Sequence, residues 1–282
     1  MPKPDAARRE LVLVGAGRMG SALLDGWIKA GLVTKSSPAE VIEPAPPESL
    51  RRRTSEGLAK LVSAANVDTA RTKLVVLAVK PQVLDAALEV LKPLAESGAA
   101  FLSIAAGKTI ASIASPLRGA RGAPIIIRSM PNLPASVGAG VTAAVAGPGV
   151  DAALKAQADA LLGAVGKVVW LDDESLLDAV TAISGSGPAY VFHLVEALAA
   201  AGLAIGLPKE AADSLARETI IGAAALLKAS ADSPAGLRQA VTSPGGTTEA
   251  ALKVLMGEGG LTPLMRKAAE AALRRAKELG KG

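Results

Sequence analysis

Three glycines, Gly15, Gly17 and Gly20, lie between a short, mostly apolar run at residues 10–14 and an amphipathic run that reaches Ala30. A G-x-G-x-x-G loop in this setting joins the first strand of a dinucleotide-binding sheet to the helix that follows. The first glycine makes the tight turn, the second lets the backbone approach a pyrophosphate, and the third lets helix and strand pack closely. The loop therefore predicts an α/β domain that binds a dinucleotide.

Strand-like segments recur up to about residue 171, which we take as the end of a first domain, 1–171. Mostly apolar runs predict strands at 40–42, 74–79, 101–104, 124–129, 138–146 and 167–171, and an Ala-rich run predicts a helix at 151–162. The carboxyl ends of parallel strands line the ligand crevice of an open sheet, so residues just beyond two of these strands should border the cofactor. They are Ala78, Val79, Lys80 and Pro81, and then Ala105, Ala106 and Gly107.

Glu43 follows the second predicted strand, roughly 20 residues beyond the glycine loop, where an acidic side chain can bind the adenosine ribose hydroxyls. That position favours NAD. Arg51, Arg52 and Arg53 follow closely, and a guanidinium there could bind the 2′-phosphate of NADP. These arginines could equally form a solvated helix face, so the sequence leaves NADPH or NADH open.

The second half, 172–282, has helical spacing throughout and predicts an all-α domain. An acidic helix start at Asp172, Asp173 and Glu174 precedes apolar residues at helical intervals. Residues 184–188 break this pattern, and a long helix is expected at 188–205.

Residues 197–205 are apolar all round, which requires burial on every side of the helix. One small helical domain could not cover them, so we expect two chains to bury these helices against each other as an intertwined homodimer. The single histidine, His193, lies on this helix and is expected in the core or an interface rather than in catalysis.

Gly245 and Gly246 lie at the entrance of a predicted helix, with the hydroxyls of Ser243, Thr247 and Thr248 around them. Free backbone N–H groups and the positive end of a helix dipole suit a carboxylate or phosphate. An ordinary capped helix start with a tight turn is the alternative.

Composition argues against several other classes. Lys plus Arg exceed Asp plus Glu by only 31 to 26, and two Phe, two Trp and one Tyr offer little for stacking nucleic-acid bases. With one histidine and no cysteine, the usual ligands of a transition-metal site are missing. The longest uncharged run, 129–150, contains prolines, and the first residues do not precede a signal-peptide segment. We therefore expect no metal, no nucleic acid, no membrane insertion and a cytoplasmic location.

Five motifs in this order resemble those of the pyrroline-5-carboxylate reductases, and the resemblance covers essentially the whole chain. The last two are the specific ones, because many dinucleotide enzymes share the first. The motifs are GAGRMGSAL at 15–23, AVKP at 78–81, MPN at 130–132, SGSGPAY at 184–190 and SPGGTT at 243–248.

The resemblance implies the final step of proline biosynthesis, in which NADPH or NADH gives a hydride to the ring C=N carbon of 1-pyrroline-5-carboxylate to yield L-proline. It also implies an N-terminal Rossmann domain, a helical dimerisation domain and often a pentamer of dimers. Arg18 is a departure, because members often carry a small or amide residue there. The cofactor would contact Gly15, Ala16, Gly17, Arg18, Met19 and Gly20, together with the residues named above after two of the strands.

By the same resemblance, the substrate carboxylate would lie on the Ser243 hydroxyl and on the amides near Gly246, Thr247 and Thr248. Thr248 would hydrogen-bond the ring nitrogen and is the predicted catalytic residue. Glu174 matches an acidic position that lies near the substrate in some members, although an acidic first helical turn explains it equally well.

A cyclic imine is electrophilic once its nitrogen is protonated or hydrogen-bonded, so the reaction needs orientation and one donor rather than a strong base. That chemistry suits a site without His or Cys. A β-hydroxyacid dehydrogenase is the nearer alternative, but such enzymes use a helix-borne lysine and residues 188–205 contain none. A non-catalytic NAD(P)-binding protein is the other alternative, and it would have no need of the loop at 243–248.

Overall fold

The computed structural model describes residues 11–119 and 122–280, which form two compact units. The first unit comprises the chain up to Gly185 together with the last residues from Leu273, and the second comprises Ser186–Ala272. The predicted boundary at 171/172 lies ahead of this division. Leu177 explains the difference, because it is buried in a cluster with Ala143 and Val145 of the sheet and so belongs to the first unit.

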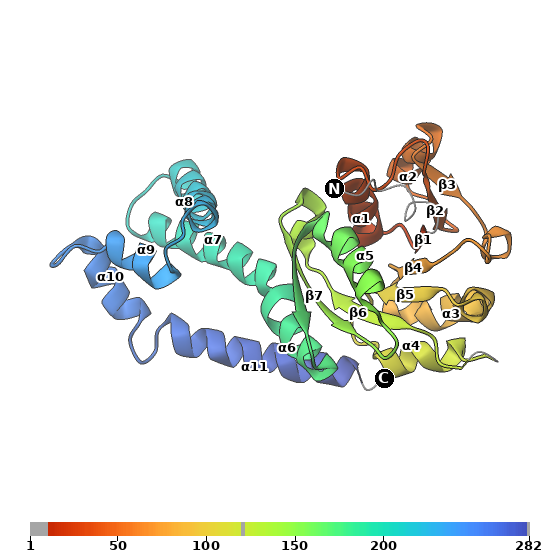
Figure 1. Cartoon of the computed structure of the whole chain (residues 1–282). Helices are drawn as coiled ribbons and strands as arrows, with labels where there is room; N and C mark the ends of the chain where they lie inside the picture. The colour runs from red at the N-terminus through yellow and green to blue at the C-terminus, as the bar shows by residue number, and fades with distance from the viewer. Residues whose placement is uncertain (1–10, 120–121, 281–282) are drawn as a thin grey trace. The chain divides into compact units, whose positions relative to one another are not determined.

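An eight-stranded sheet forms the centre of the first unit, in the order β3-β2-β1-β4-β5-β6-β7-β8 (Figure 1). All neighbouring strands are parallel except β6 and β7, which are antiparallel. The strands are β1 Leu11–Val14, β2 Ala39–Ile42, β3 Ala59–Leu61, β4 Leu74–Leu77, β5 Ala100–Ser103, β6 Ile126–Met130, β7 Gly140–Ala146 and β8 Gly166–Leu171.

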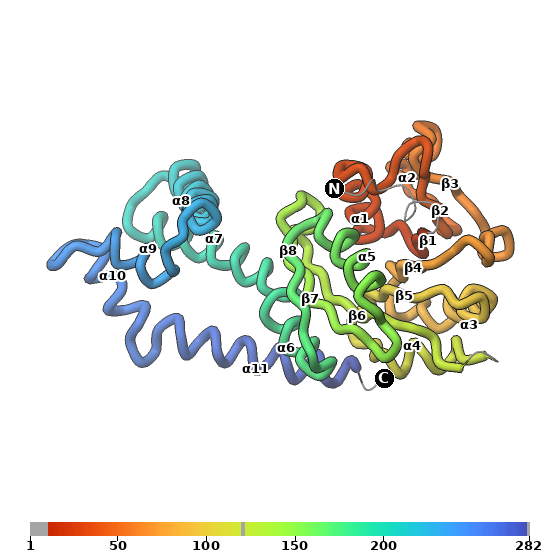
Figure 2. Tube along the Cα trace, viewed as in Figure 1, coloured from red at the N-terminus to blue at the C-terminus, as the bar shows by residue number. Residues whose placement is uncertain are grey.

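Helices cover both faces of this sheet, as the chain trace in Figure 2 shows. Leu13, Val76 and Leu102 face one hydrophobic cluster, while Val75 and Phe101 face the other. Because the central strands are buried on both sides, they read in sequence as continuous apolar runs. The helices of this unit are α1 Arg18–Lys29, α2 Glu48–Ser55, α3 Pro81–Ser97, α4 Ile110–Leu117, α5 Ala152–Gly163 and α6 Leu177–Val180.

The predicted α/β fold class and the predicted strands are confirmed, with ends shifted by a few residues. β3 was not predicted, because a three-residue edge strand with Lys60 in its middle has no recognisable pattern. The prediction that residues 184–188 break the helix is wrong. The chain instead continues through a π-helical turn, Thr181–Gly185, directly into the next helix, and the Thr181 hydroxyl donates back to Leu177 O of α6 at 2.8 Å.

The second unit is helical, as predicted. It contains α7 Gly187–Ala204, α8 Lys209–Ala229, α9 Pro234–Ala240, α10 Thr247–Leu255 and the first part of α11 Leu261–Leu279. α7 and α8 meet through small residues: a Cβ added at Gly202 would lie 3.1 Å from Cβ of Ala212. His193 is not in the core of this chain, because its side chain is 80% exposed and contacts Glu196.

Most large apolar side chains on these helices are exposed, including Phe192, Leu198, Leu215 and Ile221. In addition, the described helical run Glu174–Ala204 is long and apolar enough, by length and composition alone, to cross a membrane, and only 11% of its apolar window is buried. A single chain therefore leaves this surface without an apolar partner.

Candidate functional site

Gly15 and Gly20 have no room for a side chain. Gly15 has φ +91°, and a Cβ there would lie 2.8 Å from Ala78 O. A Cβ on Gly20 would lie 2.2 Å from Gly15 O, a backbone atom that cannot rotate away. The turn from β1 into α1 is therefore possible only with glycine at both positions.

Gly17 differs, because a Cβ on it would meet no atom of another described part of the chain within 4 Å. Gly17 is also the N-cap residue of α1, and no side chain caps that helix start. Unfilled space beside backbone N–H groups at the positive end of a helix dipole suits a bound pyrophosphate. A dinucleotide fits this loop for that reason, and Arg18 and Met19 would lie beside it.

The predicted border of the crevice lies at the same edge of the sheet. Ala78 N donates to Val14 O at 2.8 Å, which holds the end of β4 against the glycine loop, and α3 begins at Pro81. Beyond β5, Ala105 N donates to Ser103 Oγ at 3.2 Å. The carboxyl ends of β1, β4 and β5, three neighbouring parallel strands, therefore share one edge with the residues expected to border the cofactor.

Glu43 follows β2 and turns back onto the glycine loop. Its Oε2 accepts a hydrogen bond from Ala16 N at 2.8 Å, and its Oε1 accepts one from Ala45 N at 3.1 Å. Two backbone donors therefore fix this carboxylate beside the loop at the end of β2, where an adenosine ribose binds in such folds.

The loop before α10 belongs to the second unit. Gly245 has φ +72°, Gly246 N donates to Ser243 O at 3.0 Å, and no side chain caps α10 at Gly246. Ser243 and Thr247 are exposed, and Thr248 is half-buried. This loop presents hydroxyl and amide donors together, which is the arrangement that an anion requires.

Glu249 lies in the first turn of α10, and its Oε2 accepts a hydrogen bond from Gly245 N at 2.8 Å. No motif in the sequence predicted a role for this carboxylate. It satisfies one amide of the loop and also places a negative charge beside the proposed anion position.

Glu174 lies in the first unit and has two partners there. Its Oε1 accepts from Ile110 N, the first residue of α4, at 2.7 Å and from Arg128 Nη1 at 2.8 Å. The Arg128 side chain is only 7% exposed, so Glu174 neutralises a buried guanidinium. Next to it, the Asp173 side chain accepts from Ser175, and this hydrogen bond lowers the pKa of Asp173 below its usual value.

Asn132 connects separate parts of the first unit, although sequence reasoning gave it no role. Its Nδ2 donates to Ser184 O at 3.1 Å in the π-helical turn, and its Oδ1 accepts from Val141 N at 2.9 Å at the start of β7. Its place in the motif at 130–132 was the only signal in the sequence. The partners lie too far along the chain to be inferred from it.

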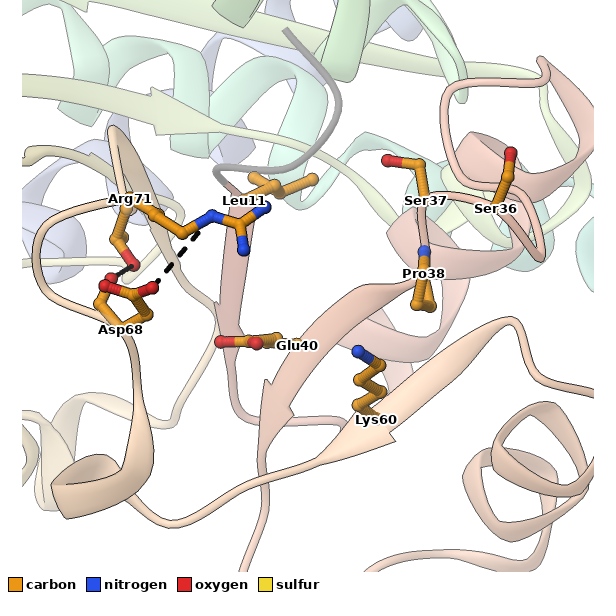
Figure 3. Close-up of a pocket in the computed structure, with 9 residues that line it drawn as sticks. Leu11, Ser36, Ser37, Pro38, Glu40, Lys60, Asp68 and Arg71 are labelled. Carbon is orange, nitrogen blue, oxygen red and sulfur yellow. Dashed lines mark hydrogen bonds and ion pairs between the residues drawn. The ribbon is translucent and has the colours of Figure 1, made fainter.

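A separate hollow lies at the opposite end of the strands (Figure 3). Leu11, Glu40 and Lys60 line it together with an ion pair of Arg71 and Asp68, whose atoms lie 3.9 Å apart. Leu11, Glu40 and Lys60 lie in β1, β2 and β3, and Asp68 and Arg71 lie in the segment before β4. No predicted site residue lies among them. Among the described residues, no group of three or more His, Cys, Asp or Glu side chains could hold a metal ion.

The open, mostly parallel sheet, the glycine loop and the acidic residue after β2 define a Rossmann-type, dinucleotide-dependent oxidoreductase. Residues 10–107 match the family described as NADP oxidoreductase, coenzyme F420-dependent. Residues 174–279 match the pyrroline-5-carboxylate reductase dimerisation family, and this region includes α7 to α11 and the loop before α10.

Full-length relatives agree. The chain is 40% identical over 271 residues to the pyrroline-5-carboxylate reductase of Pseudomonas aeruginosa, with 95% of this chain and 96% of that protein covered. It is 41% identical to the enzyme of the same name from Synechocystis, covering 96% and 98%. The chain therefore belongs to the pyrroline-5-carboxylate reductase family.

Solved structures give the same result. A pyrroline-5-carboxylate reductase from Coxiella burnetii superposes with a TM-score of 0.87 at 36% identity, covering 98% of this chain and all of that one. A Plasmodium falciparum pyrroline carboxylate reductase with NADP bound superposes with a TM-score of 0.78 at 29% identity, covering 96% and 98%.

Proposed function

We propose that this chain reduces 1-pyrroline-5-carboxylate to L-proline with NADPH or NADH, as the final step of proline biosynthesis. The observation that carries the proposal is that both required loops are present in a chain related to the reductases over its whole length. The loop before α1 suits the dinucleotide, and the loop before α10 suits the carboxylate of the imine. Family membership also sets aside the β-hydroxyacid dehydrogenase alternative.

In this proposal the Ser243 hydroxyl and the amides of Gly246, Thr247 and Thr248 bind the substrate carboxylate. The Thr248 hydroxyl donates to the ring nitrogen and so polarises the C=N bond. When bound, the cofactor supplies the hydride. A threonine hydroxyl is a poor acid, so Thr248 orients the imine, and the proton comes from solvent or arrives with the substrate. When the ring nitrogen arrives protonated, the Thr248 hydroxyl oxygen accepts its N–H instead of donating to it.

Glu174 remains a predicted substrate-binding residue, and its hydrogen bonds suggest a second role. One carboxylate oxygen accepts from both Arg128 and Ile110 N, so Glu174 links β6 to the start of α4. We propose that this contact positions the segment from Ala105 to Gly107, which precedes α4 and is expected to border the cofactor.

We also propose that the helical unit forms a homodimer. The unpartnered apolar side chains on α7 and α8 support this proposal, as does the match of 174–279 to a dimerisation family. A second chain packed on these helices would bury the same apolar surface that gives Glu174–Ala204 the composition of a membrane span. The pentamer of dimers and the cytoplasmic location stay predictions.

An assay of cofactor oxidation tests this function. Racemic 1-pyrroline-5-carboxylate is added to enzyme with NADH or NADPH, and loss of absorbance is compared with that of a 3-hydroxy acid assayed with the oxidised cofactors. Imine-dependent oxidation supports the reductase. No oxidation by a preparation that binds the cofactor would contradict it.

Thr248→Ala then tests the catalytic assignment. We expect kcat/KM to fall by at least about tenfold, or 1.4 kcal/mol of transition-state binding, because the donor to the ring nitrogen is lost. Thr262→Ala is the matched control, since Thr262 lies in the first turn of another helix, α11. A loss in Thr248→Ala no larger than in Thr262→Ala would remove Thr248 from the mechanism.

A further inference from the structure

The segment that follows β2 offers almost no hydrogen-bond donors. Residues 44–47 are Pro44, Ala45, Pro46 and Pro47, and proline has no backbone N–H. The one remaining backbone donor, Ala45 N, already donates to Glu43 Oε1 at 3.1 Å. No side chain in this segment carries a polar hydrogen. A phosphate placed here would therefore find no free donor from residues 44–47.

Glu43 adds a fixed negative charge at the same place. Its carboxylate receives hydrogen bonds from Ala16 N and Ala45 N, and an ionised carboxylate has lone pairs left for further donors. The 2′ and 3′ hydroxyls of an adenosine ribose can supply those donors. A 2′-phosphate cannot, and its charge of roughly −1.5 to −2 would face the carboxylate.

Two of the three arginines after β2 are engaged with carboxylates. Arg53 Nε donates to Asp25 at 2.8 Å and its Nη1 to Glu56 at 3.1 Å, and these hydrogen bonds, chiefly the one to Asp25, raise the pKa of Arg53. Arg52 Nε lies 3.9 Å from Glu56 Oε1. Asp25 of α1 and Glu56, which follows α2, therefore engage Arg53 closely, whereas Arg52 makes only a longer, solvent-exposed contact with Glu56.

Arg51 is the remaining candidate for a 2′-phosphate. Its Nε donates to Pro46 O at 3.1 Å, so its guanidinium lies beside the same segment. Arg51 is exposed, and fixing a long exposed side chain on a ligand costs conformational entropy. Glu43 has no such cost, because its two hydrogen bonds already hold it.

We propose that Glu43 makes this chain selective for NADH over NADPH, on the basis of the reductase function proposed above. The ribose hydroxyls bind the Glu43 carboxylate, while residues 44–47 offer a 2′-phosphate no free donor of their own. NADP in the Plasmodium falciparum relative is compatible with this, because at 29% identity the ribose-binding segments of the two chains can differ.

Direct binding tests the inference independently of turnover. NADH and NADPH are titrated into the full-length protein, and nicotinamide fluorescence gives each Kd. We expect NADH to bind at least about tenfold more tightly. In Glu43→Gln the ratio of the two constants should fall at least about fivefold, since the charge is lost while the amide oxygen still accepts from Ala16 N.

Glu48→Gln is the matched control, because it removes one negative charge at the start of α2. In this variant the ratio of the NADPH and NADH dissociation constants should stay within about twofold of the ratio in the unsubstituted protein. NADPH binding as tight as NADH, or an unchanged ratio in Glu43→Gln, overturns the inference. A selective loss of NADPH binding in Arg51→Ala also overturns it, by assigning the phosphate to that guanidinium. Failure of the imine assay alone would contradict only the proposed reaction.

Discussion

The loop before α1 and the loop before α10 both combine glycines with an uncapped helix start, but neighbouring atoms restrain them to different degrees. A Cβ on Gly20 would lie 2.2 Å from a backbone oxygen, whereas a Cβ on Gly245 would meet nothing within 4 Å. On Gly246 it would meet Ser243 Oγ, the end of a side chain that can rotate. Packing against the sheet therefore holds the first loop in place, while the second loop is open.

In both loops a carboxylate accepts a hydrogen bond from a backbone N–H. Glu43 accepts from Ala16 N and Glu249 accepts from Gly245 N, both at 2.8 Å. Glu43 lies where ribose hydroxyls would bind, and its carboxylate can accept their hydrogen bonds. Glu249 stands beside an expected substrate carboxylate and opposes its charge. The same contact can thus assist one ligand and weaken another.

Gly20→Ala should produce the largest effect. The added Cβ would displace the Gly15 carbonyl, so we expect the free energy of unfolding to fall by at least about 3 kcal/mol, near the upper end of overpacking costs. Urea unfolding of the purified variant measures this change.

Gly17→Ala is its control and sharpens the comparison. The stability should stay within about 0.5 kcal/mol because the methyl group meets no protein atom, but dinucleotide binding should be lost because the methyl group fills the pyrophosphate position. Normal NADH binding by Gly17→Ala would show that the loop holds the cofactor in another way.

Glu174→Ala extends the comparison to a third carboxylate that accepts from a backbone N–H at the start of a helix. Unlike the other two, this carboxylate also contacts a buried guanidinium. Glu174 is the acidic partner of Arg128 among residues 11–119 and 122–280, so removing it leaves the buried guanidinium without this counter-ion. Because Glu174 itself is 28% exposed, we expect a loss of about 2–3 kcal/mol in the free energy of unfolding, at or below the lower end for buried pairs. Chemical unfolding measures it.

Glu174→Gln separates the possible roles of this residue. It keeps an acceptor for Ile110 N and should cost less stability than Glu174→Ala. If Glu174 only positions α4, the KM for the imine should stay near its original value in Glu174→Gln. A large rise in that KM with unchanged stability would instead support the predicted substrate contact.

Glu249→Gln should have the smallest effect. Glutamine can still accept from Gly245 N, so the loop keeps its form, but the charge that opposes the substrate carboxylate is gone. At several ångströms in water this repulsion is about 0.6 kcal/mol, so the KM for the imine should fall roughly threefold with little change in kcat. The difference should shrink in 1 M salt. A rise in KM would mean that Glu249 assists binding.

Local sequence patterns predict much of the fold of this chain. Buried parallel strands read as apolar runs, the glycine loop has a fixed relation to the strand and helix around it, and the change from strand to helical spacing marked the second half. The sequence did not predict β3, because an edge strand of three residues is too short to show alternation. The π-helical turn was not predicted because the Ser-Gly-Ser-Gly-Pro run at 184–188, which begins at its end, resembles an ordinary helix break.

The sequence by itself determined the fold class, both glycine loops and the family, because each depends on neighbouring residues whose spacing is visible in the chain. Only the tertiary structure decided which distant groups Glu43 and Glu174 contact. Glu43 reaches Ala16 across 27 positions, and Glu174 reaches Arg128 across 46. Partners so far apart in sequence meet only once the sheet has formed, so no local pattern could reveal them.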